Sequence, residues 1–244
     1  MPDWLYSPLR QLKRGLSTPP KDYHSTSGEH PPTINLLGDR DIEWSWVASQ
    51  LPQKTGEALD FGSGRSFLGL MAANKGFNVT AVDLGAVQWP YLHPQLRFVQ
   101  GDILKLPLPM SHFDLVINCS TIEHVGLVGR YSVTDDRPDG DLEAMARLRE
   151  LMKHGGVMLL TIPLGQDAVF APKCRVYGVQ RLPRLLDGFS IEQESYWVKD
   201  DHNRWIQCDK QTALDFKASA GSSSPLQNVT ALGCFILSRP GMGE

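Results

Sequence analysis

The chain has 244 residues, 41% of them hydrophobic, which is enough for one large domain with a sizeable core. Its 24 basic and 27 acidic residues give a formal net charge of -3. This balance gives no global electrostatic reason to expect nucleic acid or an anionic membrane as a partner. No apolar run approaches the roughly 18 residues that a membrane span needs, so we expect a cytoplasmic protein.

The four cysteines lie far apart in the sequence, without a C-x-x-C pair. The histidines do not cluster at ligand spacing either. We therefore predict neither a zinc site nor a disulfide framework, and a reducing cytosol is the expected compartment.

The N-terminal stretch has a composition of its own. Residues 3–16 place Leu5, Leu9, Leu12 and Leu16 on one stripe of a predicted helix. Such a basic amphipathic helix can lie on a membrane, but more often it caps a neighbouring domain or pocket. Residues 17–33 are rich in Pro, Ser and Thr and predict a linker. We predict an appendage over residues 1–38 and one domain over 39–244.

After Gly38 the pattern indicates helices alternating with short, nearly all-apolar strands. A first helix is expected in DRDIEWSWVASQL. Strands are predicted over residues 57–61, 78–83, 96–100, 113–118 and 155–162, and helices over 66–75 and 140–153. Apolar strands joined by helices are typical of a parallel sheet covered on both faces, so the fold class is α/β.

Past Pro163 the pattern changes. RLPRLLDGF predicts a short helix that ends at Gly188, and FSIEQESYWV and VTALGCFILS predict two strands that pair antiparallel at a sheet edge. Residues 199–228 are polar and predict a surface loop with a short helix at about 211–219.

The segment EALDFGSGRSFLG, residues 57–69, carries the strongest signal for chemistry. Gly62 and Gly64 allow a sharp turn and a close approach of the backbone to a ligand. Ser66 stands near the place of the third glycine of a dinucleotide fingerprint. A tight turn without any ligand is the alternative.

Two further acidic residues end the next two predicted strands. Asp83 can accept hydrogen bonds from both hydroxyls of a ribose, and Asp102 can accept one from an adenine amine. The alternative for Asp83 is an ordinary helix-cap residue, and the alternative for Asp102 is an ordinary turn residue. Because the carboxyl ends of parallel strands meet at one sheet edge, the three features together predict a cofactor site.

In these motifs the sequence resembles the class I S-adenosylmethionine-dependent methyltransferases. The matching stretches, in order, are ALDFGSG, AVD, GDILKLPLPMSHFDLVINCSTIEHV and GGVMLLTIP. The resemblance implies a Rossmann-like, doubly wound, mostly parallel seven-stranded sheet with an antiparallel edge strand, and S-adenosyl-L-methionine as cofactor. These enzymes bind no pyrophosphate and often have another residue in place of the third glycine. Ser66 at that position is therefore consistent with the resemblance.

The resemblance also implies roles for individual residues. Asp60, Gly62 and Gly64 would line the methionine part of the cofactor, Asp83 would hold the ribose, and Asp102 with Ile103 would frame the adenine. The residues expected to face the reacting sulfonium are Asn118, Cys119 and Ser120.

Two stretches depart from the family pattern. The connection LGAVQWPYLHPQ holds Pro90 and Pro94, so we expect its helix to be broken or missing, with Trp89 or Tyr91 covering the adenine. The second stretch is the long insertion from Gly126 to Asp141, which we expect to shape a substrate pocket. Its acidic residues and Glu123 offer oxygen ligands for Mg²⁺, but such runs are commonly solvated, and no metal is predicted.

A hydroxyl substrate needs a base as its proton leaves. His124 is the candidate base, and the alternative is a histidine that bonds the backbone. Glu123 is the candidate to orient it, although neighbours in sequence usually point apart on a helix. The candidate substrate-binding residues are Arg130, Tyr131, Arg175 and Tyr177, of which the last two lie in RVYGVQRLPRLLDGF, a run that resembles a poorly characterised branch of the family.

The sequence therefore predicts a methyltransferase of small molecules, with O-methylation of a sugar or natural-product hydroxyl as the leading reaction. N-methylation and a non-catalytic, cofactor-binding partner subunit are the alternatives. No nucleic acid is expected as a partner, since no basic stripe or aromatic platform is present. A nicotinamide oxidoreductase would need the full G-x-G-x-x-G motif for its pyrophosphate. The sequence lacks the third glycine, so this class of enzyme is disfavoured.

Overall fold

The computed structural model describes residues 40–88, 91–129, 133–200, 202, 204–218 and 230–241. The helix predicted over residues 3–16 and the linker after it lie outside these ranges. The division at residue 38 stays a prediction for the same reason.

The described chain begins with a helix and then alternates strands with helices, as the apolar pattern predicts. The helices are α2 (Arg40–Gln50), α3 (Leu68–Asn74), the 3-10 helix η3 (Ile122–His124), α4 (Gly140–Leu151), α5 (Arg181–Leu185) and α6 (Lys210–Asp215). The strands are β1 (Gly56–Phe61), β2 (Phe77–Asp83), β3 (Leu96–Gln100), β4 (Phe113–Cys119), β5 (Met152–Leu164), β6 (Ala168–Phe170), β7 (Cys174–Val176), β8 (Ser190–Lys199), β9 (Trp205–Cys208) and β10 (Ala231–Ser238).

The large sheet has the strand order β3-β2-β1-β4-β5-β10-β8-β9, and its first five strands are parallel. The register brings Phe61 beside Val82 on one side and Asn118 on the other. Asp83 pairs with Gln100 in the next strand. The carboxyl ends of β1, β2, β3 and β4 therefore lie along one edge, where open α/β sheets bind ligands.

The far edge of the sheet is antiparallel, as predicted, but it differs in detail. β10 inserts between β5 and β8 and is antiparallel to both. Six of the eight β10 residues are buried, as expected for a strand inside a sheet that is covered on both faces. β9 adds an eighth strand within the expected surface loop. Its residues carry no continuous apolar signal, and β9 forms by pairing with the open edge of β8.

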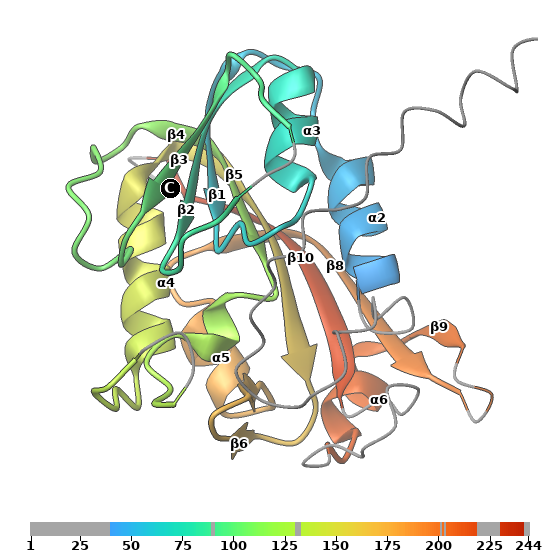
Figure 1. The fold of residues 1–244 in the computed structure, drawn as a ribbon. Helices are drawn as coiled ribbons and strands as arrows, with labels where there is room; N and C mark the ends of the chain where they lie inside the picture. Colours follow the sequence, from blue (N-terminus) through green and yellow to red (C-terminus); the bar gives the residue numbers. More distant parts are fainter. Residues whose placement is uncertain are drawn as a thin grey trace, which may run out of the picture. The chain divides into compact units, whose positions relative to one another are not determined.

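Helices cover both faces of the sheet (Figure 1), which confirms the doubly wound α/β class. Side chains of α2 and α3 pack with one face in a cluster that includes Val47, Leu68 and Ile117. Side chains of α4, α5 and α6 join the cluster on the other face, where Leu148 and Leu160 are fully buried. Each such side chain contributes about 1.5–3 kcal/mol on burial, so these two layers stabilise the sheet.

Between β2 and β3 the described residues, which omit 89 and 90, contain no helix, as the two prolines predict. Trp89 lies outside them. Tyr91 packs against Phe67, with ring centroids 5.6 Å apart, and donates a hydrogen bond to the Ser66 carbonyl oxygen at 2.8 Å. Among the helices that can be described, none is both long and apolar enough to cross a lipid bilayer.

Candidate active site

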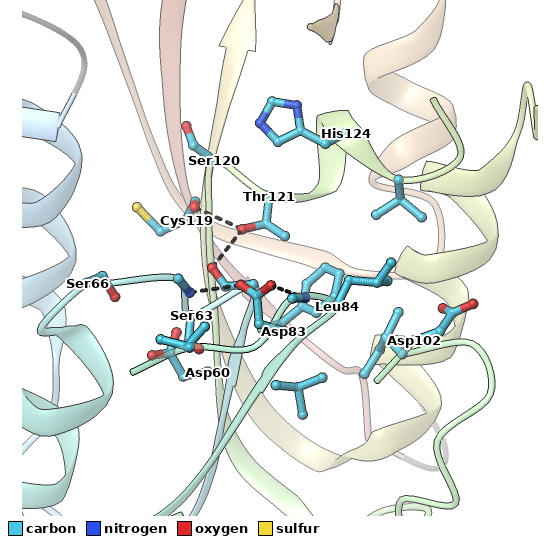
Figure 2. A pocket seen from close by; sticks show the side chains of 18 of the residues that line it. Asp60, Ser63, Ser66, Asp83, Leu84, Asp102, Cys119, Ser120, Thr121 and His124 are labelled. Atoms are coloured by element: carbon cyan, nitrogen blue, oxygen red, sulfur yellow. Dashed lines mark hydrogen bonds between the residues drawn. The ribbon is translucent and has the colours of Figure 1, made fainter. Parts of the chain in front are cut away.

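A cavity of about 640 Å³ opens at the carboxyl edge of the parallel strands. This size falls in the range of about 300–1,000 Å³ that small-molecule sites occupy. Its walls come from α2, the glycine turn after β1, the ends of β2 and β3, and the loop after β4 (Figure 2). The lining includes Asp60, Gly62, Gly64, Asp83, Asp102, Ile103, Cys119, Ser120 and His124 from the predicted site.

The glycine turn depends on both of its glycines. Gly62 has φ +68° and Gly64 has φ +46°, in the left-handed region that favours glycine. A Cβ at Gly62 would lie 2.1 Å from Cγ2 of Thr121, so no larger residue fits there. The turn is thus locked against the loop that follows β4.

Asp83 holds the same turn from the next strand. Its Oδ2 accepts a hydrogen bond from the Gly64 amide at 2.9 Å, and its Oδ1 accepts one from the Gly85 amide at 2.9 Å. A carboxylate oxygen can accept more than one hydrogen bond, so each oxygen retains acceptor capacity toward the cavity. Asp83 is therefore both a structural anchor and an available acceptor.

Asp60 is the buried acid of the site. Its side chain lies at the end of β1 with 3% exposure, and its Oδ2 has no hydrogen-bond partner among the described residues. Burial raises the pKa of Asp60 to about 7, the Gly69 amide opposes this increase, and the nearby Asp83 carboxylate adds to it. A cation bound beside Asp60 would relieve the cost of that burial.

Asp102 and Ile103 line the cavity at the end of β3. Asp102 Oδ1 accepts a hydrogen bond from the Leu104 amide at 3.0 Å, which fixes the turn that follows the strand. The Ile103 side chain is almost fully buried beside it. An acceptor next to an apolar side chain is an arrangement suited to a flat heterocycle that carries an amine.

The residues at the end of β4 differ in their access to the cavity. Cys119 and Ser120 line it, whereas Asn118 is fully buried and its amide lies 3.7 Å from the Met145 sulfur. Successive side chains of a strand point to opposite faces, so Asn118 points away from the face that Cys119 occupies. Burial raises the pKa of the Cys119 thiol well above its usual value, with a further contribution from Glu43.

A buried glutamate that the sequence interpretation missed supports this strand end. Glu43 of α2 accepts hydrogen bonds from Ser120 Oγ and, at 3.0 Å, from Thr161 Oγ1. Ser120 has φ +46°, a strained conformation for a residue with a side chain. The available signal was the position of Glu43 on the buried face of the predicted helix, three and four residues before Trp46 and Val47.

Glu123 and His124 meet in η3, although neighbours in sequence usually diverge. His124 Nε2 lies 3.4 Å from Glu123 Oε1, and His124 Nδ1 lies 2.6 Å from the carbonyl oxygen of Lys173. Glu123 has only 2% exposure, whereas His124 lines the cavity. In Figure 2 the His124 ring lies on the opposite side of Thr121 from Asp83. His124 therefore occupies the end of the cavity farther from the acidic strand ends, with Glu123 buried behind it.

Two predicted substrate residues are placed elsewhere. Arg175 and Tyr177 are fully buried and do not line the cavity, which corrects their assignment to its wall. The Arg175 guanidinium donates to backbone carbonyls, and Tyr177 donates to Asp141 Oδ2 at 3.1 Å. The sequence showed their side-chain chemistry but not their burial. Arg130 and Tyr131 lie outside the described residues.

The insertion after β4 contributes to the cavity, as its position predicts. Gly126, Val133 and Arg137 line it. Asp141, one of the acids considered for a metal, is instead fully buried and bound to the side chains of Arg181 and Tyr177. Within the described ranges, no three His, Cys, Asp or Glu side chains are grouped to hold a metal ion.

Two residues of α2, Arg40 and Trp44, also line the cavity and were not predicted. The guanidinium of Arg40 lies 5.7 Å from the centre of the Trp44 ring, and that ring meets Phe67 edge-on with centroids 6.4 Å apart. Both belong to the helix expected before β1. The apolar pattern of a helix predicts its buried face, but it does not predict which of the other side chains line a cavity.

Comparison with family models and curated proteins gives one partial match. A family model described as a Caenorhabditis protein of unknown function, DUF268, matches residues 107–219, less than half of the chain. That stretch includes Glu123, His124 and Arg175. A search of curated proteins found no match.

Solved structures resemble the chain more broadly. The 1,6-didemethyltoxoflavin-N1-methyltransferase of Burkholderia thailandensis, bound to 1,6-didemethyltoxoflavin and S-adenosylhomocysteine, matches with a TM-score of 0.53 and 16% identity, over 83% of this chain and 82% of that one. The [4+2]-cyclase SpnF matches with a TM-score of 0.57 and 16% identity, over 82% and 80%. An S-adenosylmethionine-dependent methyltransferase assigned in Listeria monocytogenes matches with a TM-score of 0.53 and 11% identity, over 82% and 98%. At these identities the likeness establishes the fold, and a fold by itself does not fix an activity.

Proposed function

We propose that this chain, whose fold is that of the class I S-adenosylmethionine-dependent methyltransferases, transfers a methyl group from S-adenosylmethionine to a small molecule. The observation that carries the proposal is the shared cavity of Asp60, Asp83 and Asp102, each at the end of a successive strand, with His124 at its other end. This shared lining supports a cofactor site that is continuous with the place of the reacting group.

Asp60 provides the test of fit for the cofactor. S-adenosylmethionine carries a cationic amine, and Asp60 offers a buried carboxylate whose Oδ2 has no partner in the described structure. A protein keeps such an oxygen without a hydrogen bond only at a cost of about 1–3 kcal/mol. A cationic amine bound in the cavity beside Asp60 would favour the ionised carboxylate, so the residues fit the methionine part of the cofactor.

The other two acids fit the remaining parts of the same molecule. Asp83 would accept hydrogen bonds from the ribose hydroxyls with the acceptor capacity that its two backbone contacts leave. Asp102 would accept one from the adenine amine, and Ile103 would pack against the ring. The open glycine turn allows the backbone to approach the cofactor closely.

When bound, S-adenosylmethionine supplies an electrophilic methyl group, so the protein has to align a nucleophile and accept its proton. His124 and Glu123 would accept this proton together, because Nε2 and Oε1 lie 3.4 Å apart and can share it. The Cys119 thiol, whose pKa burial raises, stays protonated and does not compete for the methyl group.

The finer reaction that we propose is O-methylation of a sugar or natural-product hydroxyl. A hydroxyl has a high pKa and needs a base within reach, and the base pair at the cavity end supports this choice. N-methylation is the second candidate. One solved structure with this fold is an N1-methyltransferase, and an amine requires less help to lose its proton.

Cofactor binding is the first experiment. Isothermal titration calorimetry with S-adenosylhomocysteine should detect binding to the native protein and at least about tenfold weaker binding to Asp83→Asn, which loses a carboxylate acceptor. Asp187→Asn, at an exposed residue after α5, is the matched control and should bind as the native protein does. If the native protein binds neither S-adenosylhomocysteine nor S-adenosylmethionine, the proposal fails.

Methyl transfer is the second experiment. The protein is incubated with isotopically labelled S-adenosylmethionine and a panel of sugars, natural-product alcohols and amines, and labelled products are detected by mass spectrometry. For a hydroxyl acceptor, His124→Gln should lower kcat by about 100-fold or more while S-adenosylhomocysteine still binds. Unchanged turnover of that acceptor would remove His124 from the reaction, and products from amines alone would favour N-methylation.

A further inference from the structure

The small hairpin of β6 and β7 contacts the His124 segment from two directions. One contact is made by the turn of the hairpin, where the Lys173 carbonyl oxygen lies 2.6 Å from His124 Nδ1. The other is made by Arg175, whose Nη1 donates to the carbonyl oxygens of Val125 at 2.6 Å and of Glu123 at 3.4 Å. These two carbonyls flank His124 in the sequence, so the hairpin holds its backbone and its ring together.

Arg175 joins this segment to the insertion that lines the cavity. Its Nη2 donates to the carbonyl oxygens of Arg137 at 3.0 Å and of Pro138 at 3.3 Å, and its Nε lies 3.5 Å from Asp141 Oδ1. The side chains of Arg175 and Asp141 are 1% and 0% exposed. A planar guanidinium with five donors can satisfy all these acceptors at once, which a lysine ammonium cannot.

The Lys173 contact also determines where the imidazole carries its proton. A backbone carbonyl can only accept, so a hydrogen bond at this position requires a proton on Nδ1. In the neutral ring, Nε2 is then the nitrogen with the lone pair. Nε2 is also the nitrogen that faces the Glu123 carboxyl group.

We propose that Arg175 is a positioning residue that, through the β6–β7 hairpin, fixes His124 as the Nδ1–H tautomer, with Nε2 facing the Glu123 carboxyl group. The proposal rests on the proposed function for its catalytic meaning, although the tautomer can be tested without any substrate. It reassigns Arg175, for which the sequence suggested substrate binding, to the support of the base from behind the cavity.

The test is a long-range proton–nitrogen NMR spectrum of the histidine rings in protein labelled with ¹⁵N-histidine. The signals that disappear in His124→Gln identify His124. In the native protein above the pH at which the ring becomes neutral, His124 should show the Nδ1–H pattern. In Arg175→Lys this pattern should give way to a mixture of tautomers.

Arg181→Lys is the matched control. Arg181 also binds Asp141 and the Pro138 carbonyl, but no described contact joins it to residues 123 or 125. It should retain the native His124 spectrum. An Nε2–H pattern in the native protein would overturn the proposal, even if Arg175→Lys fails to fold. An unchanged spectrum in a folded Arg175→Lys would also overturn it.

With a hydroxyl acceptor in hand, a double-mutant cycle gives the kinetic readout. Arg175→Lys should lower kcat by about 10- to 100-fold with a smaller change in KM, because a misplaced base slows the chemical step. It should have little further effect in the His124→Gln background, since both changes act through one group. Additive losses would contradict the proposal. S-adenosylhomocysteine affinity should stay within about threefold of native, so this failure is distinguishable from a failure of the proposed function.

Discussion

Glu43 and Thr161 are joined by a hydrogen bond of 3.0 Å between Oε1 and Oγ1, although 118 residues separate them in the sequence. The same glutamate accepts a hydrogen bond from Ser120, so α2, the loop after β4 and β5 meet at one buried carboxyl group. This contact determines how the helix that carries Arg40 and Trp44 approaches the cavity.

Replacing Glu43 by alanine should therefore weaken the packing of α2 against the loop after β4 and against β5. Glu43→Ala removes the acceptor of the buried Thr161 hydroxyl and of the partly buried Ser120 hydroxyl, and should lower the free energy of unfolding by about 2–4 kcal/mol. Glu43→Gln keeps an acceptor oxygen and should lose less. Chemical denaturation measures both, and Gln50→Ala, on the same helix, is the control. Equal stability of native protein and Glu43→Ala would contradict this account.

Gly62→Ala should damage the glycine turn through a clash as well as through backbone strain. The added Cβ would lie 2.1 Å from Thr121 Cγ2, and the residue would keep φ +68°. We expect a loss of about 2–4 kcal/mol in the free energy of unfolding.

Gly155→Ala provides the matched control for this substitution. Gly155 has φ +74°, and nothing lies within 4 Å of the Cβ position, so this variant reports the backbone cost alone, about 1 kcal/mol. Thermal or urea unfolding compares the two variants. A similar loss in both would mean that the Thr121 contact adds no cost.

Asp60→Asn should stabilise the ligand-free protein at pH 8. Burial raises the pKa of Asp60 from 3.8 to about 7, so between these pH values the unfolded chain releases a proton that the folded chain keeps. Stability from this group is fully present below about pH 4 and is lost as pH rises to about 7.

At about 1.4 kcal/mol for each pKa unit, the loss at pH 8 is on the order of 4 kcal/mol, and a neutral asparagine avoids it. Urea unfolding at pH 5 and pH 8 should show the advantage of Asp60→Asn at the higher pH. Asp187→Asn, at an exposed residue, should show no such difference. If Asp60→Asn were equally destabilised at both pH values, the buried carboxyl group would not have the raised pKa.

Cofactor affinity should also depend on the protonation of Asp60. It should rise with pH, whereas the stability of the ligand-free protein falls. If the ionised Asp60 holds the cationic amine, the affinity for S-adenosylhomocysteine should rise by up to about tenfold per pH unit below pH 7 and level off above it. Calorimetry between pH 5.5 and 7.5 measures the slope. Asp60→Asn should bind more weakly and with little dependence on pH. A native affinity that is flat over this range would separate Asp60 from the amine.

The sequence by itself determined the alternation of strands and helices and the order of the chemical groups along the chain. Apolar strands such as 113–118 and the turn at Gly62 and Gly64 follow local rules of burial and backbone freedom. Because parallel strands end at one edge, the meeting of Asp60, Asp83 and Asp102 could be predicted as well.

Only the tertiary structure decided which polar side chains face the cavity and which are buried. Arg175 and Tyr177 looked like substrate residues, and Glu43 was not singled out, yet all three are nearly inaccessible to solvent. Their roles depend on carbonyl, carboxylate and hydroxyl partners that lie far away in the sequence. Hydrophobic periodicity records the need for burial, whereas a buried polar group is stabilised by specific distant partners that periodicity cannot reveal.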